Sequence, residues 1–262
     1  MSVALLRRTA RAVLERSSWG QRWLFKYRQG IRGPHGRPVA PWWNAVLRSH
    51  ADVEASVAQV RALGLPLVNN PPKNWDSLAA LHLILDSTRR AARVFDAGGE
   101  RYSMILPWLW LYGYTRLVAG NLIFGEPEWL GPIRYERADI TATGYPDRAF
   151  DAVTCLSVVE HGVDLGLYFR EMARVLVPGG LLITSTDYWD TPVDTLGHRA
   201  FGVPIRIFTR SDILEALALA HDQGFEATGD LDLSVGERAV QWPDLDLHYT
   251  SAIFSLRKRA DR

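Results

Sequence analysis

The sequence predicts an α/β protein in which a parallel sheet follows a helical N-terminal region. From residue 91 onward, short β-rich runs alternate with helical runs, which is the order expected for βαβ units. Residues 1–90 instead carry helical periodicity, interrupted by glycine and proline. The 262 residues suffice for one large domain with an appendage, and their 47% hydrophobic and 23% charged content is typical of a globular protein. We therefore expect a helical cap over residues 1–90 and a sheet domain over residues 91–262.

The first 32 residues predict a basic amphipathic helix. They hold eight Lys or Arg and one acid. Five apolar residues are spaced for one helical face: Val3, Leu6, Ala10, Val13 and Leu14. Such a helix either docks on a membrane surface or a partner, or packs on its own domain with a solvated basic face.

Two more helical runs complete the N-terminal region. Residues 42–65 carry helical periodicity up to Pro66, and residues 75–92 are rich in helix formers. The break NNPPKN separates them. Lys73 and Trp75, which stand at the start of the second run, are positioned either to close over a ligand or to serve as loop and cap residues.

Seven runs after residue 91 read as strands. They are ARVFDA (92–97), TRLVAG (115–120), IRYERAD (133–139), FDAVTCLSV (150–158), GLLITSTDY (180–188), FEATGDLDL (225–233) and LHYTSAIFSLRK (247–258). Helices are expected over 102–112, 165–176 and 211–223. Residues 121–132 leave room only for a short helix.

Composition excludes several classes of protein. A net charge of +1 supplies no overall field for holding nucleic acid. The single cysteine, Cys155, lies in an apolar run, so a disulfide framework and a thiolate metal cluster are both ruled out and we expect no metal. No run is long and apolar enough to span a membrane, and the N-terminus lacks the apolar core of a signal peptide. We expect a cytoplasmic protein.

Ligands of open parallel sheets bind beyond the carboxyl ends of the strands. Gly98 and Gly99 form a tight turn that lets the backbone approach a ligand. Asn121 is placed to bond a ribose hydroxyl, and Asp139 is placed to accept a hydrogen bond from an adenine amino group. The residues after the strands therefore predict a nucleoside site: Asp96, Ala97, Gly98, Gly99, Asn121, Asp139, Ile140, Leu156 and Ser157.

The charge at this turn indicates which nucleoside derivative fits. The phosphate-binding pattern G-x-G-x-x-G is absent, and Asp96 and Glu100 would repel a pyrophosphate. An adenosine that carries a cationic centre would be attracted instead. S-adenosylmethionine is such a molecule.

Residues 150–189 carry a family resemblance. FDAVTCLSVVEH resembles the fourth strand and following loop of class I S-adenosylmethionine-dependent methyltransferases. LYFREMARVLVPGGLLIT resembles their next helix, Pro-Gly-Gly turn and fifth strand. The resemblance implies a Rossmann-like, seven-stranded, mostly parallel sheet with helices on both faces and an antiparallel last strand. It also implies S-adenosylmethionine as cofactor and methyl transfer to an oxygen or nitrogen of a small metabolite.

Two residues depart from the family pattern. Glu100 stands where the glycine loop usually continues, and Asn121 replaces the usual ribose-binding acid. A methyltransferase fold with a degenerate cofactor site, serving another reaction or a partner, is therefore the alternative. A nicotinamide-dependent oxidoreductase is a third, which the missing phosphate-binding glycines disfavour.

Two histidines are candidates for catalysis. His161 follows the fourth strand at the lip of the expected pocket and is placed to take a proton from an acceptor hydroxyl. His198 lies in the long segment after the fifth strand, where this family often admits its acceptor. A purely structural role for His161 in its loop remains open. Asp187 is a further candidate to line the acceptor pocket.

Overall fold

The computed structural model describes residues 17–200 and 202–260. The apolar face expected from Val3 to Leu14 lies outside the described residues. Six α-helices are described: α2 (Ser18–Gln29), α3 (His50–Ala62), α4 (Lys73–Ser87), α5 (Ile105–Leu111), α6 (Leu165–Val175) and α7 (Arg210–Asp222), with a short 3-10 helix η1 (Pro243–Leu245). None of the helices in the described ranges is long and apolar enough to cross a membrane.

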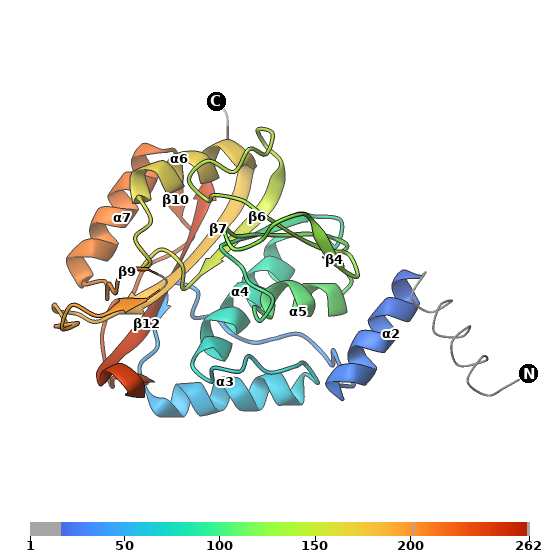
Figure 1. Ribbon diagram of the computed structural model, residues 1–262, viewed down its shortest axis with the longest axis horizontal. Helices are drawn as coiled ribbons and strands as arrows, with labels where there is room; N and C mark the ends of the chain where they lie inside the picture. The colour runs from blue at the N-terminus through green and yellow to red at the C-terminus, as the bar shows by residue number, and fades with distance from the viewer. Residues whose placement is uncertain (1–16, 201, 261–262) are drawn as a thin grey trace, which may run out of the picture.

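A ten-stranded sheet forms the centre of the molecule (Figure 1). Its strands are β1 (Ala45–Val46), β2 (Arg93–Ala97), β3 (Arg116–Gly120), β4 (Glu128–Leu130), β5 (Ile133–Glu136), β6 (Phe150–Leu156), β7 (Leu176–Tyr188), β10 (Phe225–Ala227), β11 (Val240–Trp242) and β12 (Leu247–Lys258). Two further strands, β8 (Arg199–Ala200) and β9 (Val203–Pro204), form a separate hairpin.

The strand order is β1-β12-β7-β6-β2-β3-β5-β4, with β10 and β11 also paired to β12. The inner strands β5, β3, β2, β6 and β7 are parallel, whereas β12 runs antiparallel to β7. This confirms the mostly parallel sheet and the antiparallel last strand. Each of the seven expected runs contains a strand, and the short strands β1, β4 and β11 raise the count to ten.

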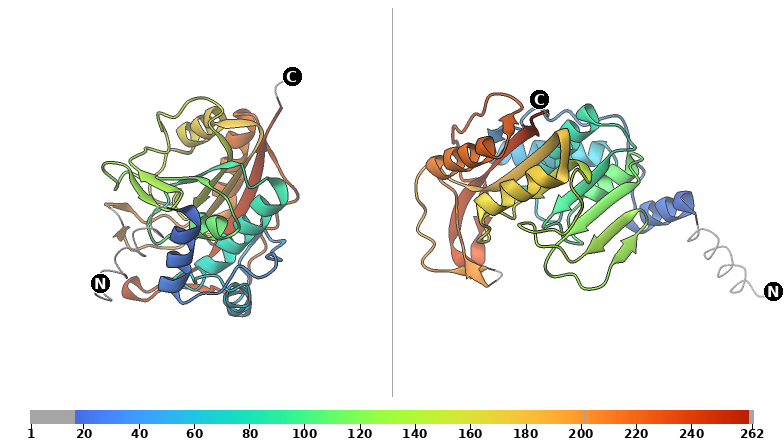
Figure 2. Two further views of the ribbon diagram at one scale, coloured as in Figure 1. Left: turned by 90° about the vertical axis from the view of Figure 1, so that its right-hand side faces the viewer. Right: turned by 90° about the horizontal axis from the view of Figure 1, so that it is seen from above.

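Helices cover both faces of the sheet, as expected (Figures 1 and 2). Neighbouring residues of β2 point to opposite faces, because side chains alternate along a strand. Val94 belongs to a core cluster with residues of α4 and α5, and Phe95 belongs to a second cluster with residues of α6 and α7. The sheet therefore has two apolar cores, one on each face.

The expectation that residues 1–90 are entirely helical is wrong at β1. Ala45 and Val46 pair with Ile253 and Ala252 of β12, and Val46 is buried. The free edge of β12 offers backbone N–H and carbonyl groups to this segment. The periodicity of residues 42–65 gives no sign of such a distant partner. Residues of α4 also belong to the same core cluster as residues of β2 and β7, so both regions share this core.

Three element boundaries differ from the expected ones. The helix expected over 102–112 begins only at Ile105. The helix that begins at Leu165 ends at Val175, before Pro178, and β7 begins at Leu176. The residue before a proline avoids helical geometry, so the chain is already extended when it reaches Pro178. Residues 128–130, where only a short helix was expected, form the edge strand β4.

Candidate functional site

The glycine turn after β2 needs both of its glycines. Gly98 has a φ of +81°, and a Cβ atom there would lie 2.5 Å from a methyl carbon of Val158. A Cβ atom on Gly99 would lie 2.1 Å from Asp96 Oδ2. The Gly98 N–H donates to the Gly120 carbonyl over 2.7 Å, which ties the turn to the end of β3. The backbone therefore passes directly over the Asp96 carboxylate.

Asn121 holds this turn from the neighbouring strand. Its Nδ2 donates to the Gly98 carbonyl over 2.7 Å, and its Oδ1 accepts from the Ile123 N–H over 3.2 Å. The side chain thus braces the glycine turn. The ribose contact expected for Asn121 stays a prediction.

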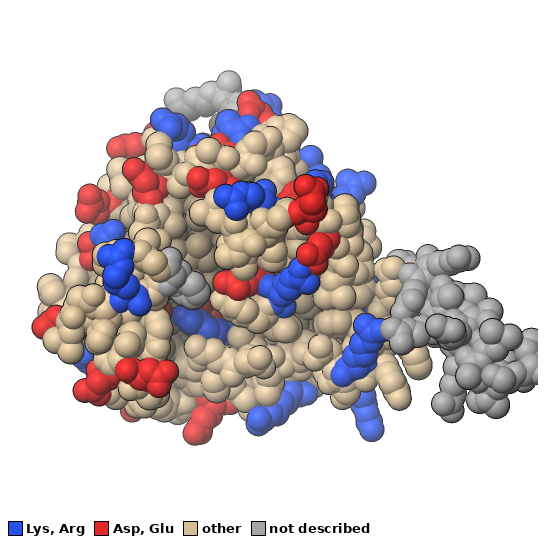
Figure 3. All heavy atoms as spheres, in the orientation of Figure 1, with Lys and Arg blue, Asp and Glu red and all other residues tan. Residues whose placement is uncertain are grey.

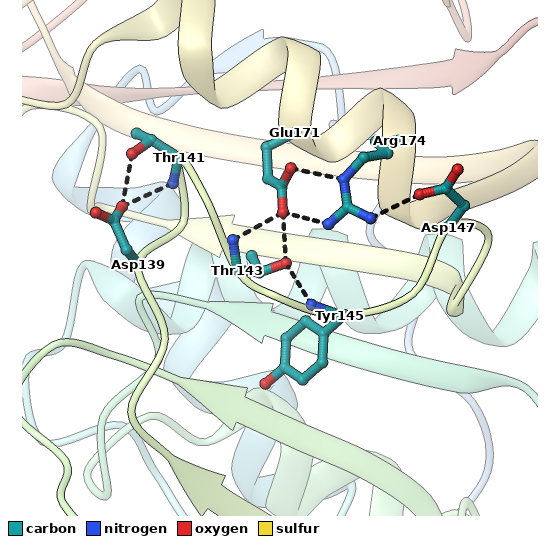
Figure 4. A network of polar contacts seen from close by, with 7 residues as sticks. All are labelled: Asp139, Thr141, Thr143, Tyr145, Asp147, Glu171 and Arg174. Carbon is teal, nitrogen blue, oxygen red and sulfur yellow. Dashed lines mark hydrogen bonds and ion pairs between the residues drawn. The ribbon is translucent and has the colours of Figure 1, made fainter.

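Asp139 lies in the exposed segment after β5. Its Oδ1 accepts from the Thr141 N–H over 2.9 Å and from Thr141 Oγ1 over 2.7 Å (Figure 4). The next residue, Ile140, is buried in the second core cluster. The hydrogen bonds of Asp139 and the burial of Ile140 together fix the start of the segment.

Glu171 of α6 fixes the rest of that segment (Figure 4). Its carboxylate accepts from the N–H and hydroxyl of Thr143 and from the guanidinium of Arg174, which also pairs with Asp147. Burial alone would raise the pKa of Glu171, but the hydrogen bonds from Arg174 and Thr143 lower it overall. The loop that carries Asp139 is therefore pinned to α6 by a charged network.

Asp96 is the most unusual acid at the strand ends. It is buried in β2, where its Oδ1 accepts from Thr154 Oγ1 over 2.8 Å. Its Oδ2 has no hydrogen-bond partner among the described residues. Burial raises the pKa of Asp96 to about 7, with a smaller contribution from Asp76. A buried carboxylate oxygen without a donor is unfavourable unless something else binds it.

Lys73 enters the site from the first turn of α4. Its Nζ lies 2.5 Å from Ser157 Oγ and 3.3 Å from Asp187 Oδ1. The buried Asn74 side chain bonds Val68 and Pro71 and so fixes the loop from which α4 starts. A cation at a helix N-terminus opposes the helix dipole, so the surrounding carboxylates must stabilise it.

Three buried carboxylates act on this lysine: Asp76, Glu160 and Asp187. Asp76 Oδ2 accepts from Ser185 Oγ over 2.7 Å. Burial alone would lower the pKa of Lys73, but Asp187, Asp76 and Glu160 raise it overall. Burial, followed by the charge of Asp187, raises the pKa of Glu160 to about 8. Lys73 is therefore held by buried acidic groups from three parts of the chain: its own helix, the loop after β6 and the end of β7.

The two candidate histidines lie on neighbouring segments. The His161 N–H donates to the Val158 carbonyl over 3.0 Å, and burial lowers the pKa of His161. His198 precedes the β8–β9 hairpin and its carbonyl accepts from Ile205. A Cβ atom on Gly162 would lie 3.4 Å from Val203, so the hairpin packs against the loop that carries His161.

Sequence reasoning missed Asp76 and left Trp75 with either a ligand-closing role or a loop and cap role. Trp75 is buried and stacks on Trp42 with ring centroids 6.3 Å apart. It lines a cavity of about 480 Å³ that none of the predicted cofactor or catalytic residues reaches. Asp76 follows Lys73 by three residues and so shares its helical face. An acid on the otherwise apolar buried face of this helix was the signal available in the sequence.

Figure 3 shows a hollow near the middle of this face of the molecule. Figure 1, in the same orientation, has β6 and β7 at that place. Acidic, glycine-rich and apolar residues from β2, β3, β5, β6 and their following loops meet along one edge of the sheet. This is the arrangement of a nucleoside-binding α/β protein.

One stretch of the chain matches a known family of domains. Residues 118–184 match a family model described as a methyltransferase domain. Together with the fold, this match supports the resemblance to class I S-adenosylmethionine-dependent methyltransferases seen in the sequence.

One relative and two solved structures are similar to the chain. A sterol 24-C-methyltransferase of Gibberella zeae is 30% identical over 118 residues, which cover 42% of this chain and 30% of that protein. The match thus spans under a third of that relative's length. The 1,6-didemethyltoxoflavin-N1-methyltransferase of Burkholderia thailandensis has a TM-score of 0.52 at 21% identity, covering 80% of this chain and 87% of that one. The [4+2]-cyclase SpnF has a TM-score of 0.50 at 17% identity, covering 72% of this chain and 83% of that one. At these identities the structures show a shared fold.

Proposed function

We propose that the protein binds S-adenosylmethionine at the carboxyl ends of β2, β3, β5 and β6 and methylates a small molecule. The observation that carries the proposal is the buried Asp96 carboxylate, whose Oδ2 lacks a donor beneath the Gly98-Gly99 turn. A ligand with an ammonium group would supply the missing hydrogen bond and the missing positive charge. A phosphate would be repelled.

The surrounding residues fit the remaining parts of this cofactor. Asp96 and Glu100 attract its ammonium group, and Lys73 with Ser157 is placed to hold its carboxylate. Asn121 faces the ribose and Asp139 the adenine amino group. Ala97, Gly98, Gly99, Ile140 and Leu156 provide backbone and apolar contacts along the same edge.

Bound S-adenosylmethionine supplies a methyl group on a positively charged sulfur. The acceptor's lone pair forms a bond to the methyl carbon while the carbon–sulfur bond breaks, and the electron pair of that bond stays on sulfur. The acceptor's proton passes to His161, which is neutral near pH 7 because burial lowers its pKa. Glu160 is poorly suited to this role, because burial raises its pKa to about 8 and it is mostly protonated there.

We propose an oxygen or nitrogen of a metabolite as the methylated atom, because such an acceptor has a proton for His161 to remove. The similar proteins include both a nitrogen and a carbon methyltransferase. His198 and the β8–β9 hairpin flank the acceptor side, and α4 of the N-terminal region caps it. The cytoplasmic location expected from the sequence stays a prediction.

Calorimetry with S-adenosylhomocysteine and NADH tests the proposal. S-adenosylhomocysteine keeps the ammonium group and should bind saturably, and NADH should not. Methyl-labelled S-adenosylmethionine with pooled oxygen and nitrogen acceptors then tests transfer, with His161→Ala as control. Saturable binding of NADH alone would overturn the proposal.

A second candidate is a methyltransferase fold without methyl transfer. The similarity to a cyclase supports it, as do Glu100 and Asn121, which depart from the family pattern. Binding of neither ligand would favour a degenerate site. Binding of S-adenosylhomocysteine without transfer to any acceptor would favour another reaction.

A further inference from the structure

Helix α2 carries an exposed aromatic ridge made of Trp19, Trp23 and Tyr27. These side chains are 69%, 45% and 73% exposed. Their spacing of four residues places them on one helical face, and the rings of Trp23 and Tyr27 stack with centroids 5.5 Å apart. Isolated exposed apolar residues need no explanation, but three large aromatic residues in line on one helix do.

The opposite face of α2 fixes the helix to the body of the protein. Phe25 is buried, and its ring lies 5.2 Å from that of Trp110 in α5. Trp110 also lies against Gly131, where a Cβ atom would be 2.5 Å from its ring. Since Gly131 directly follows β4, α2 and the outer strand β4 both border Trp110. The ridge is therefore held in place and faces outward.

Further apolar side chains are exposed on this edge of the sheet. Trp129 of β4 is 65% exposed, and Leu122 and Ile123 are exposed after β3. Figures 1 and 2 show α2 projecting at the same margin of the molecule as β4.

The charge carried by α2 and the residues that follow it has one sign. Arg22, Lys26, Arg28 and Arg32 lie in α2 or just after it, and residues 17–50 contain no Asp or Glu. Figure 3 shows Lys and Arg atoms beside α2, and atoms of both signs of charge farther in, at the place where Figure 1 has β4. Trp and Tyr favour the interface between lipid and water, because one end of each ring system is apolar and the other bonds water. Basic residues beside them attract anionic head groups.

We infer that α2 docks the protein on a membrane surface that contains anionic phospholipid, with the aromatic ridge inserted at the head-group level. The helix lies on the membrane and does not cross it. This inference rests on α2 and its surroundings, and it is independent of the proposed methyl transfer.

Co-sedimentation of the full chain with vesicles tests the inference. We expect binding to vesicles of phosphatidylcholine and phosphatidylserine, and weaker binding to phosphatidylcholine alone. The triple variant Trp19→Ala, Trp23→Ala, Tyr27→Ala should bind at least roughly a hundredfold more weakly, since burial of one large apolar side chain favours binding by about tenfold or more. The double variant Lys26→Gln, Arg28→Gln should bind anionic vesicles about fivefold more weakly for each charge removed. Its binding to phosphatidylcholine vesicles should not change.

Leu214→Ala is the matched control, because Leu214 is also exposed but lies in α7. It should bind like the parent. If the triple variant is unstable in a thermal melt, Trp19→Ala alone should still weaken binding by roughly tenfold. Parental binding by the ridge variants would overturn the inference, as would no binding of the parent to anionic vesicles. A ridge-dependent dimer in sedimentation velocity, without vesicle binding, would instead assign the ridge to a second copy of the chain.

Discussion

Lys73 Nζ lies 2.5 Å from Ser157 Oγ, which joins the first turn of α4 to the loop after β6. The two residues are 84 positions apart in the sequence. Through this contact a helix from the N-terminal region supplies a positive charge beside the buried carboxyl groups of Asp76, Glu160 and Asp187. A substitution of Lys73 should therefore affect both the site and the stability of the fold.

Lys73→Met should lower the free energy of unfolding at pH 7 by about 3 kcal/mol, because removing one partner of a buried ion pair leaves the other charge uncompensated. Urea unfolding measures the change. The loss should shrink toward pH 4, because burial raises the pKa of Asp76, which loses its charge in that range. Lys26→Met, at an exposed hydrogen bond, serves as control. An equal loss at both positions would show that Lys73 is not the counter-charge of these buried carboxyl groups.

The free energy of unfolding without ligand should fall as pH rises from about 4 to about 8. Burial raises the pKa of Asp96 to about 7 and that of Glu160 to about 8, whereas both groups titrate near pH 4 in the unfolded chain. The folded state therefore binds more protons in this window, and stability declines with pH. Asp96→Asn should reduce the slope and stabilise the ligand-free protein by on the order of 3 kcal/mol at pH 8.

The same Asp96→Asn variant should bind S-adenosylhomocysteine about ten- to a hundredfold more weakly, because a charged hydrogen bond to the ammonium group is lost. Calorimetry measures this affinity. Thr154→Ala, which removes only the bond to Oδ1, is the comparison. Stabilisation without loss of affinity would place the ammonium group elsewhere.

Gly98→Ala should destabilise the protein more than Gly144→Ala. Both glycines have positive φ values, +81° and +74°, so both variants bear the backbone strain of roughly 1 kcal/mol. Only Gly98 has a neighbour in the way, because Val158 lies 2.5 Å from the new Cβ atom while nothing lies within 4 Å of the one at Gly144. Adding Val158→Ala should recover part of the difference in thermal melts. Equal losses at both glycines would mean that the turn has room to adjust.

Asn121→Asp should destabilise the protein although it restores the acid usual in the family. Asn121 Nδ2 donates to the Gly98 carbonyl, and a carboxylate has no donor to replace it. We expect a loss of roughly 1 to 3 kcal/mol, larger than for Asn121→Ala, because two acceptors would then face each other. Chemical denaturation of the three proteins compares them. A more stable Asn121→Asp variant would show that the bond to Gly98 is unimportant.

His161→Ala should lower turnover by about a hundredfold with little change in affinity for S-adenosylhomocysteine, as expected for a general base. In the parent, turnover should fall as pH drops through the pKa of His161, which burial places below its ordinary value. The variant should lack this limb of the pH profile. If it turns over like the parent at every pH, His161 shapes its loop and the reaction depends on alignment alone.

Much of the sheet domain could be predicted from the sequence. After residue 91, the spacing of apolar residues differs between strand runs and helix runs. Short apolar runs such as residues 150–156 can therefore be predicted as strands from the sequence alone. The glycine turn was predicted as well, because glycine is what a tight turn with positive φ requires. These features depend on neighbours in the sequence, which is why the sequence alone determined them.

Tertiary structure alone decided the remaining features. Ala45 and Val46 became a strand because β12 offered a free edge, and Asp76 became part of the site because α4 packs over β7. Asn121 turned out to brace Gly98, a contact that no spacing rule predicts. Each of these depends on groups brought together from distant parts of the chain. A buried polar group takes whatever partner packing places beside it, and packing is determined only when the whole chain has folded.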